Sequence, residues 1–318
     1  MLAVDAGARY GIHPSLDKLG KKCYFLLIEP ETEEFERLIF KYRENSNVTV
    51  IDCGLGSENS DMLLEKTSHG ALSSCYSIDK TSITQKNRQE QYHVKSRIPI
   101  RVRKLDELID QKIDFIKLDI EGMELEALKG SESILSEVCG IRCEVQLKKT
   151  FSDPKSGIFA EIDQWLSQRN FELISIDNLL AGRQLNEWSS SDKDGVLVNV
   201  DAIWRNSAKM QMIISGSCPA SEARKVICWH FINDLGAEAL RILKICLDKG
   251  INLSVNNKTS IEDHADDIYI LNKLILEHIL KIWNKPTISV DSLKVLYEKV
   301  FNTSIPEYHT IRYLIDDI

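Results

Sequence analysis

Residues 2–11 read LAVDAGARYG, a short apolar run that ends in the pattern D-x-G-x-x-x-G. The apolar residues predict a strand with Asp5 at its tip. Gly7 and Gly11 would shape the turn that follows. Because glycine has no Cβ, such a turn lets the backbone come close to a bound ligand. The stretch therefore predicts a nucleotide-like binding site within the first eleven residues.

The first two-thirds of the sequence alternate between short apolar runs and segments with helical spacing. The predicted strands cover residues 2–5, 24–29, 48–53, 98–102, 113–120, 141–147, 171–176 and 196–203. The predicted helices cover residues 31–42, 125–135 and 158–168. This alternation indicates an α/β fold, in which a parallel sheet is covered by helices on both faces. Ligands bind at the carboxyl ends of the strands in such sheets.

Two segments depart from this alternation. Residues Gly54–Tyr92 are polar and irregular, which predicts a loop over the binding site. After a break in the pattern at Ser207–Ser221 the sequence is helical, with predicted helices over residues 222–248, 268–283 and 291–301. We therefore expect one domain over residues 1–206 and a helical extension over residues 207–318. The apolar faces of the extension would pack within the chain or form a homodimer interface.

Composition excludes several classes of protein. The net charge is −8 and the isoelectric point is about 5.5, which argues against broad nucleic-acid binding. No apolar run is long enough to span a bilayer and no signal segment precedes the first motif, so we expect a cytoplasmic protein. The eight cysteines form no C-x-x-C pair and no zinc-like cluster, and we expect them to be reduced.

A second acid, Glu29, ends the next predicted strand at the spacing of a strand–helix–strand unit. An acid in this position commonly accepts hydrogen bonds from the ribose hydroxyls of an adenosine ligand. A dinucleotide would favour G-x-G-x-x-G, and this turn lacks the middle glycine. S-adenosylmethionine fits better, because it carries no phosphate and its sulfonium cation tolerates an acidic pocket. A nicotinamide-dependent dehydrogenase and a non-catalytic α/β domain remain alternatives.

Residues 115–124 read FIKLDIEGME, in which Lys117, Asp119 and Glu121 alternate along a strand end. Burying three ionisable side chains without partners would be costly. They could form a Lys117–Glu121 ion pair, with Asp119 capping the next helix. They could instead be a charged cluster suited to base catalysis or to binding a divalent metal ion. Glu144, at the end of the next strand, is either an alternative base or a structural acid.

Several motifs together resemble the FkbM-type methyltransferases. They are, in order along residues 1–205, VDAGARYG, IEPETEEFERL, GALSSCY, RKLDELI, DFIKLDIEGMELEALKG and CEV. The string K-x-D-x-E-G-x-E-x-x-x-L-x-G is the most specific of them. The resemblance implies a Rossmann-like class I methyltransferase fold with a mostly parallel seven-stranded sheet between helices. It also implies S-adenosylmethionine as the methyl donor.

By position, the resemblance implies roles for particular residues. The cofactor-binding residues would be Asp5, Gly7, Ala8, Gly11, Glu29, Pro30 and Gly54, with Glu29 as the ribose-binding acid. The catalytic residues would be Lys117 as an orienting cation, Asp119 and Glu121 as bases or metal ligands, and Glu144 as an alternative base.

The reaction that the resemblance implies is methylation of a hydroxyl oxygen on a sugar, glycan or natural-product acceptor. A sugar hydroxyl is a weak nucleophile, so a base or a divalent metal ion should assist it. We expect Gly54–Tyr92, the C-terminal helices or another subunit to cover the pocket. A scaffold or binding protein that keeps the fold without turnover is the other interpretation.

Overall fold

The computed structural model describes residues 1–82, 90–179, 183–184, 189–191, 193–253, 265–282 and 290–301. Residue packing divides the chain into two compact units. The sheet unit comprises residues 2–12 and 25–205, and the helical unit comprises residues 1, 13–24 and 206–318. Residues 13–24 thus group with the helices that follow residue 206. A domain boundary at residue 206 stays a prediction.

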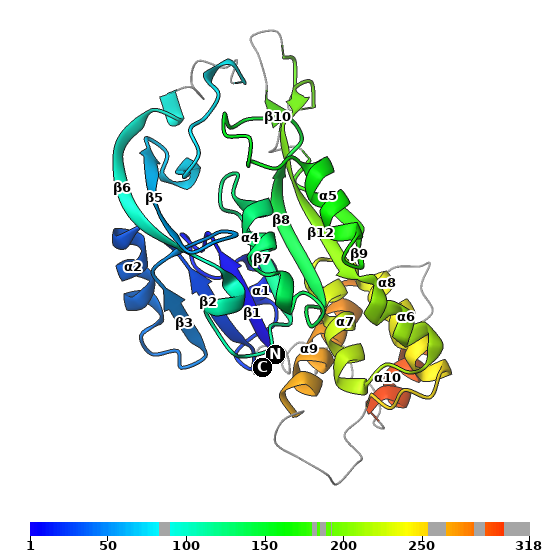
Figure 1. Ribbon diagram of the computed structural model, residues 1–318. Coiled ribbons are helices and arrows are strands. Elements are labelled where there is room, and N and C mark those ends of the chain that lie inside the picture. Colours follow the sequence, from blue (N-terminus) through cyan, green and yellow to red (C-terminus); the bar gives the residue numbers. More distant parts are fainter. Residues whose placement is uncertain are drawn as a thin grey trace. The chain divides into compact units, whose positions relative to one another are not determined.

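A seven-stranded sheet forms the centre of the sheet unit (Figure 1). Its strands are β1 (Leu2–Ala6), β2 (Tyr24–Ile28), β3 (Val48–Ile51), β7 (Phe115–Leu118), β8 (Gly140–Gln146), β9 (Phe171–Asp177) and β12 (Asn199–Asn206). Their order is β3-β2-β1-β7-β8-β12-β9. The pairs β2–β3, β1–β7 and β7–β8 are parallel, whereas β12 runs antiparallel to β8. The expected α/β fold with a mostly parallel sheet is confirmed.

The central strands are buried on both faces, which explains their nearly continuous apolar sequences. All five residues of β1 and all four of β7 are buried. Val4, Ile116 and Ile141 lie on three adjacent strands and are fully buried in one core cluster. Their close packing fixes the positions of the strand ends that follow them.

The helices α2 (Thr32–Tyr42), α4 (Glu124–Lys129) and α5 (Phe159–Ser167) belong to the sheet unit. α2 packs against β3, α5 against β9, and α4 against both β8 and α5. The helix expected over residues 125–135 is shorter than predicted, because α4 ends at Lys129 and a separate 3₁₀ turn covers Glu132–Ile134. Gly130 caps the end of α4, and only glycine fits there, since a Cβ would lie 1.9 Å from the carbonyl oxygen of Gly56.

The expectation that Gly54–Tyr92 is a loop is wrong in part. The segment contains β4 (Gly54–Leu55) and β5 (Ser60–Thr67), which form a second sheet with β6 (Val94–Arg103) in the order β4-β6-β5. Figure 1 shows β5 and β6 as a long, curved pair. The strand expected at residues 98–102 therefore belongs to this sheet and not to the central one. A further short pair joins β10 (Arg183–Gln184) to β11 (Val196–Leu197).

The burial pattern of β5 explains why the sequence does not predict this second sheet. Leu64 on β5 and Ile100 and Val102 on β6 are buried in a small cluster with Tyr76, Met123 and Phe151. Leu63, the neighbour of Leu64, is 54% exposed, so the apolar residues of β5 do not share one face. A strand with so short an apolar stripe gives a weak alternating pattern.

The helical unit contains α1 (Pro14–Asp17), α6 (Ser207–Ser215), α7 (Ala220–Ile232), α8 (Gly236–Asp248), α9 (Ala265–Ile282) and α10 (Val290–Phe301). α7 packs against both α8 and α9, and Trp229 on α7 is fully buried. The expected helices over residues 268–283 and 291–301 correspond to α9 and α10, although Trp283 lies outside the described residues. No helix among the described residues is long and apolar enough to cross a membrane.

Two details of this unit differ from expectation. Residues 207–215 form α6 and not a break, because the Asn206 side chain accepts a hydrogen bond from the Lys209 amide at 3.1 Å and Gly216 ends the helix at φ 81°. Residues 222–248 form two helices, which are separated at Asp234, where φ is 60°. Aspartate tolerates this left-handed conformation better than most residues. All eight cysteines are free thiols, as expected.

Candidate active site

An open cavity of about 750 Å³, called here the first cavity, lies where β1, β2 and β7 end in the sheet unit. Six residues expected at the site line it: Gly7, Glu29, Pro30, Gly54, Asp119 and Glu121. Apolar side chains from the second sheet and its neighbours complete the wall: Leu55, Leu64, Ile100 and Met123. Residues Gly70, Ala71, Ser73 and Cys75 also line it, so the segment Gly54–Tyr92 does cover part of the pocket.

The remaining predicted cofactor residues lie beneath the cavity surface. Asp5 and Ala8 are buried, and neither they nor Gly11 are among the lining residues. The amides of Gly7 and Ala8 both donate to the carbonyl oxygen of Ile28, at 3.0 and 3.2 Å, and the Gly11 amide donates to the Ala8 carbonyl at 2.7 Å. These bonds fold the turn after β1 over the end of β2.

Gly7 is required by a close approach of two chain segments. Its φ is 76°, and a Cβ at this position would lie 1.8 Å from the backbone carbonyl oxygen of Asp119. No side chain fits between the turn after β1 and the end of β7. The glycine of the D-x-G pattern is therefore needed so that the ends of β1 and β7 can pack closely.

Asp5 and Lys117 form a buried ion pair beneath the cavity. They are direct partners in the parallel pairing of β1 with β7, so their side chains lie on the same face of the sheet. The Lys117 Nζ lies 3.1 Å from Asp5 Oδ1 and 3.6 Å from Asp119 Oδ2. Burial alone would lower the pKa of Lys117, but the two carboxylates outweigh it and raise that pKa above its ordinary value. Lys117 is thus a cation held beneath Asp119.

Glu29 and Glu31 are two buried acids at the start of α2. One Glu29 oxygen accepts a hydrogen bond from the Glu31 amide at 2.9 Å. Glu31 is paired with Arg9 at 2.6 Å and with Lys66 at 2.5 Å. Burial opposes ionisation of Glu31, but its hydrogen bonds with Lys66 and Arg9 lower its pKa. Glu31 is therefore the ion-paired acid of the two, and its negative charge is balanced by Arg9 and Lys66.

Among the described residues, no such pair of cations contacts Glu29. Burial raises its pKa to about 7, although the Glu31 amide and the charge of Arg9 act in the opposite direction. Glu29 lines the first cavity, where it can accept hydrogen bonds from a ligand. It changes its charge near neutral pH, which makes a ligand that requires its ionised form sensitive to pH.

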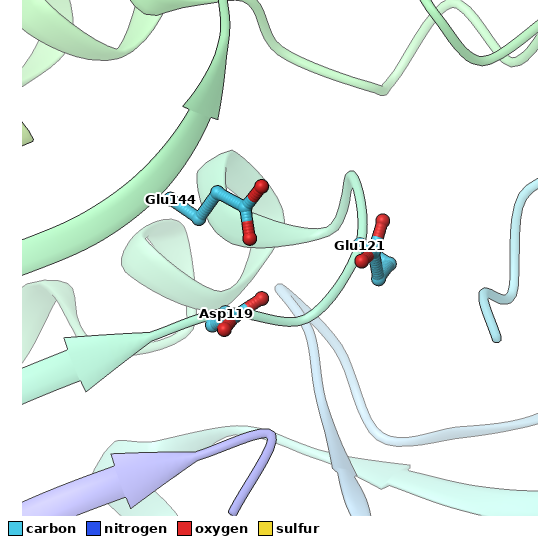
Figure 2. A group of neighbouring side chains, drawn as sticks. All are labelled: Asp119, Glu121 and Glu144. Atoms are coloured by element: carbon cyan, nitrogen blue, oxygen red, sulfur yellow. The ribbon is translucent and has the colours of Figure 1, made fainter. Parts of the chain in front are cut away.

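Three carboxyl groups from different parts of the sheet unit converge beside the first cavity. Figure 2 shows Asp119 directly after one strand, Glu121 on the turn that follows, and Glu144 on the neighbouring strand. One oxygen from each of the three lies within 4.8 Å of the others, and all three side chains are half-buried. This acidic trio brings together three of the four residues expected to be catalytic.

The turn that carries Glu121 has an unusual backbone. Glu121 has φ 52° and Gly122 has φ 97°, both in the left-handed region. The Glu124 carboxyl group accepts hydrogen bonds from the Ile120 and Gly122 amides at 2.9 and 3.0 Å. The Ser74 hydroxyl donates to the Glu121 carbonyl at 2.5 Å. The turn is therefore fixed from two sides.

These contacts decide between the structural alternatives for residues 117–121. Lys117 pairs with Asp5 and Asp119 and not with Glu121. Asp119 is not the cap of α4, because Met123 occupies that position. β7 ends at Leu118, so the side chains of Lys117, Asp119 and Glu121 do not alternate along a strand. The cluster forms because the chain turns after β7.

Glu144 on β8 is the member of the acidic trio whose pKa is shifted most clearly. Burial and the nearby charge of Asp119 raise its pKa well above the ordinary value of a glutamate. Its side chain also accepts a hydrogen bond from the Asn199 amide group on β12. Glu144 therefore holds its proton more readily than an ordinary glutamate, because two close carboxyl groups do not ionise together readily.

A second cavity, of about 650 Å³, adjoins the acidic trio. Its lining residues are His69, Leu72, Gln91, Tyr92, Glu121, Glu144, Gln146, Val198 and Asn199. Glu121 lines both cavities, and Asp119 and Glu144 face one cavity each. Most of the second lining is polar and carries hydrogen-bonding groups. The trio thus stands between a mainly apolar space and a polar one.

Sequence reasoning missed several residues of this arrangement. Glu31 follows Glu29 closely and could have been found in the motif IEPE. Glu124 lies inside the motif used for the resemblance, but no pattern marks it as the acceptor for two backbone amides. Tyr92 and Asn199 come from distant segments, and only the folded chain brings them to the trio.

The seven-stranded, mostly parallel sheet is the one that a class I methyltransferase fold predicts. Residues 5–173 match the family model described as the methyltransferase FkbM domain, which covers more than half of the chain. The chain belongs to the FkbM methyltransferase family, which confirms the resemblance seen in its motifs. Comparison with curated proteins gives no match.

Several solved structures resemble the chain at low identity. Methyltransferase FkbM from Methylobacillus flagellatus KT shares 19% identity with a TM-score of 0.37; the match covers 64% of this chain and 42% of that one, so the chain spans less than half of its length. The fibrillarin/Nop5p complex gives 12% identity and a TM-score of 0.34 over 64% of this chain and 72% of that one. A SAM-dependent methyltransferase from Aquifex aeolicus gives 13% identity and a TM-score of 0.33 over 65% and 82%.

Substituting Gly7 with alanine should destabilise the chain by more than the cost of a left-handed backbone, because the new Cβ would overlap the Asp119 carbonyl. Gly250→Ala is the matched control, since Gly250 has φ 72° and open space around it. The control should lose about 1–2 kcal/mol of stability. Thermal unfolding of both variants measures the difference. Equal losses would mean that the contact with Asp119 does not constrain the turn.

Proposed function

We propose that the protein transfers the methyl group of S-adenosylmethionine to a hydroxyl oxygen of a sugar, glycan or natural-product acceptor. The observation that carries this proposal is the position of Glu121, which lines both the first and the second cavity. A methyl donor in the first cavity and an acceptor in the second would meet at the acidic trio. This is the arrangement that an in-line transfer between two bound molecules requires.

The residues of the first cavity suit the proposed cofactor. Glu29, at the end of β2, would accept hydrogen bonds from the ribose hydroxyls. The side chains of Leu55, Leu64 and Ile100 offer an apolar surface for an adenine ring. Acidic groups would attract the sulfonium and ammonium charges of S-adenosylmethionine, whereas they would repel the pyrophosphate of a nicotinamide dinucleotide. The cavity therefore favours the methyltransferase over the dehydrogenase alternative.

The acidic trio would act on the acceptor. S-adenosylmethionine supplies an electrophilic methyl group when it is bound. An ionised carboxylate of the trio, Asp119 or Glu121, would accept the proton of the acceptor hydroxyl. At the same time the hydroxyl oxygen would bond to the methyl carbon, and the bond between that carbon and the sulfur of the donor would break. Glu144 holds a proton more readily than an ordinary glutamate, so it would orient the acceptor as a hydrogen-bond donor. Lys117 would hold Asp119 in place from below.

The same three carboxyl groups would alternatively bind a divalent metal ion. Their oxygens lie within 4.8 Å of one another, and hard cations prefer such ligands. A metal ion there would activate the acceptor hydroxyl in place of the base.

Homodimerisation through the C-terminal helices and a cytoplasmic location also stay predictions.

Isothermal calorimetry of the full chain should show binding of S-adenosylmethionine and of S-adenosylhomocysteine. Glu29→Ala should weaken both by more than about tenfold, the value of one charge-assisted hydrogen bond. Glu36→Ala, which removes an exposed acid on α2, is the control and should bind normally. If neither ligand binds the unmodified chain, the proposed enzyme function is wrong.

Cofactor binding should become tighter as the pH rises through 7. Ribose hydroxyls need the ionised form of Glu29, and burial raises the pKa of that group to about 7. The affinity for 5′-methylthioadenosine, which has no group that titrates in this range, should rise roughly tenfold between pH 6 and pH 8. Glu29→Gln should remove the dependence. A slope that persists in this variant would assign the titration to another group.

Asp119→Asn and Glu121→Gln should each lower methyl transfer by about 10²–10⁴-fold, the usual contribution of a general base. Binding of S-adenosylhomocysteine should change little, because the ribose and adenine contacts remain. Asp61→Asn, an exposed acid on β5, should leave transfer unchanged. Transfer of radiolabelled methyl groups to a glycan library measures these effects, and chelation with EDTA separates a base from a metal site. Full activity of both variants would contradict the assignment.

A further inference from the structure

A third cavity, of about 1170 Å³, adjoins the second one in the sheet unit. Its lining includes Glu65, Ser77, Lys80, Tyr92, His93 and Arg97. Tyr92 lines both the second and the third cavity, so its side chain borders both spaces. An acceptor bound at the acidic trio that reached past Tyr92 would enter the third cavity.

Backbone hydrogen bonds hold Tyr92 at the junction. The Ser68 amide donates to the His93 carbonyl at 2.8 Å, and the His69 amide donates to the Gln91 carbonyl at 3.0 Å. These bonds fix the residues on both sides of Tyr92. The ring of Tyr92 is half-buried, and an aromatic face of this kind can pack against the carbon–hydrogen face of a sugar ring.

The third cavity carries an excess of positive charge. Arg97 donates to Glu65 Oε1 from Nε at 3.0 Å and from Nη2 at 2.8 Å, and the Ser77 hydroxyl donates to the same oxygen at 3.0 Å. A guanidinium group has five N–H donors, so Arg97 keeps three for a ligand, and its side chain is 60% exposed. Lys80 is exposed, and no carboxylate in the described part of the chain pairs with it. Two cations thus face one carboxylate.

We propose that the acceptor is anionic, with a carboxylate or phosphate group bound by Lys80 and Arg97 in the third cavity. Its reacting hydroxyl lies at the acidic trio in the second cavity, with Tyr92 between the two groups. This inference rests on the proposed function and names the class of acceptor. Planar N–H donors of arginine and the ammonium of lysine both suit carboxylate and phosphate oxygens.

The charges also set the direction in which the acceptor binds. The trio of carboxyl groups repels an anionic group, and the third cavity attracts it. An acceptor with both a hydroxyl and an anion is therefore bound in one orientation, with the hydroxyl at the trio. A neutral acceptor would lack this selection. The chain as a whole has a net charge of −8. Lys80 and Arg97 therefore make the third cavity a local positive site in an acidic protein, which suits the binding of an anion.

The test compares three sugars as probes: D-glucose, D-glucuronate and D-glucose 6-phosphate. Ligand-observed NMR measures their affinities for the full chain saturated with S-adenosylhomocysteine. At least one anionic sugar should bind about tenfold more tightly than glucose, the effect of one charge-assisted contact. The double variant Lys80→Gln/Arg97→Gln should lose this preference. The two anionic probes distinguish a carboxylate from a phosphate.

The control is the double variant Lys95→Gln/Arg101→Gln. It removes the same charge from exposed positions on β6, and Arg101 is 59% exposed and paired with Asp52, much as Arg97 is paired with Glu65. The control should keep the preference for the anion. The proposal is overturned if no anionic sugar binds better than glucose, if the first variant keeps the preference, or if the control loses it equally. Failure of S-adenosylhomocysteine to bind would instead count against the proposed function.

Discussion

The site depends on the buried ion pair between Asp5 and Lys117. The two residues are direct neighbours on adjacent central strands of a sheet whose interior is mostly apolar. Breaking such a pair by removing one partner typically costs about 3–5 kcal/mol, because the other charge stays buried. A shift of β1 against β7 by one residue would separate the pair, so it favours a single register. That register sets Gly7 against the Asp119 carbonyl and thereby joins the turn after β1 to the turn after β7.

The charged row continues across the sheet beneath the trio. Lys117 lies opposite Arg142 on β8, and Arg142 is paired with Asp201 at 2.7 Å and with Asp177 at 3.2 Å. Each cation in this row has two carboxylate partners. Asp201 lies opposite Glu144 in the pairing of β12 with β8, and its charge adds to the rise in the pKa of Glu144. The interior of the sheet thus contributes to the protonation of the groups at its edge.

Much of the fold could be predicted from the sequence, because strands buried on both faces leave continuous apolar runs. The turn after β1 was predictable too, since only glycine fits at Gly7. β5 was not predictable, because its apolar stripe is only Met62 and Leu64 and the residue between them, Leu63, is also apolar but exposed. The expected residues Glu29, Asp119 and Glu121 do line the first cavity, whereas Asp5 and Ala8 are buried beneath it. Spacing along a chain identifies strand ends, but it does not separate a residue that faces a ligand from one that supports it.

The backbone of the turn after β7 explains why the trio required a structure. A non-glycine residue with positive φ, such as Glu121 at 52°, costs of the order of 1–3 kcal/mol. Two amide hydrogen bonds to Glu124 and the Ser74 hydroxyl on the Glu121 carbonyl offset this cost. In an extended conformation, residue 121 would continue the line of β7 and leave Asp119 and Glu144 without a third carboxyl group. The strained conformation turns Glu121 to the boundary of the two cavities, where its carboxyl group joins those of Asp119 and Glu144.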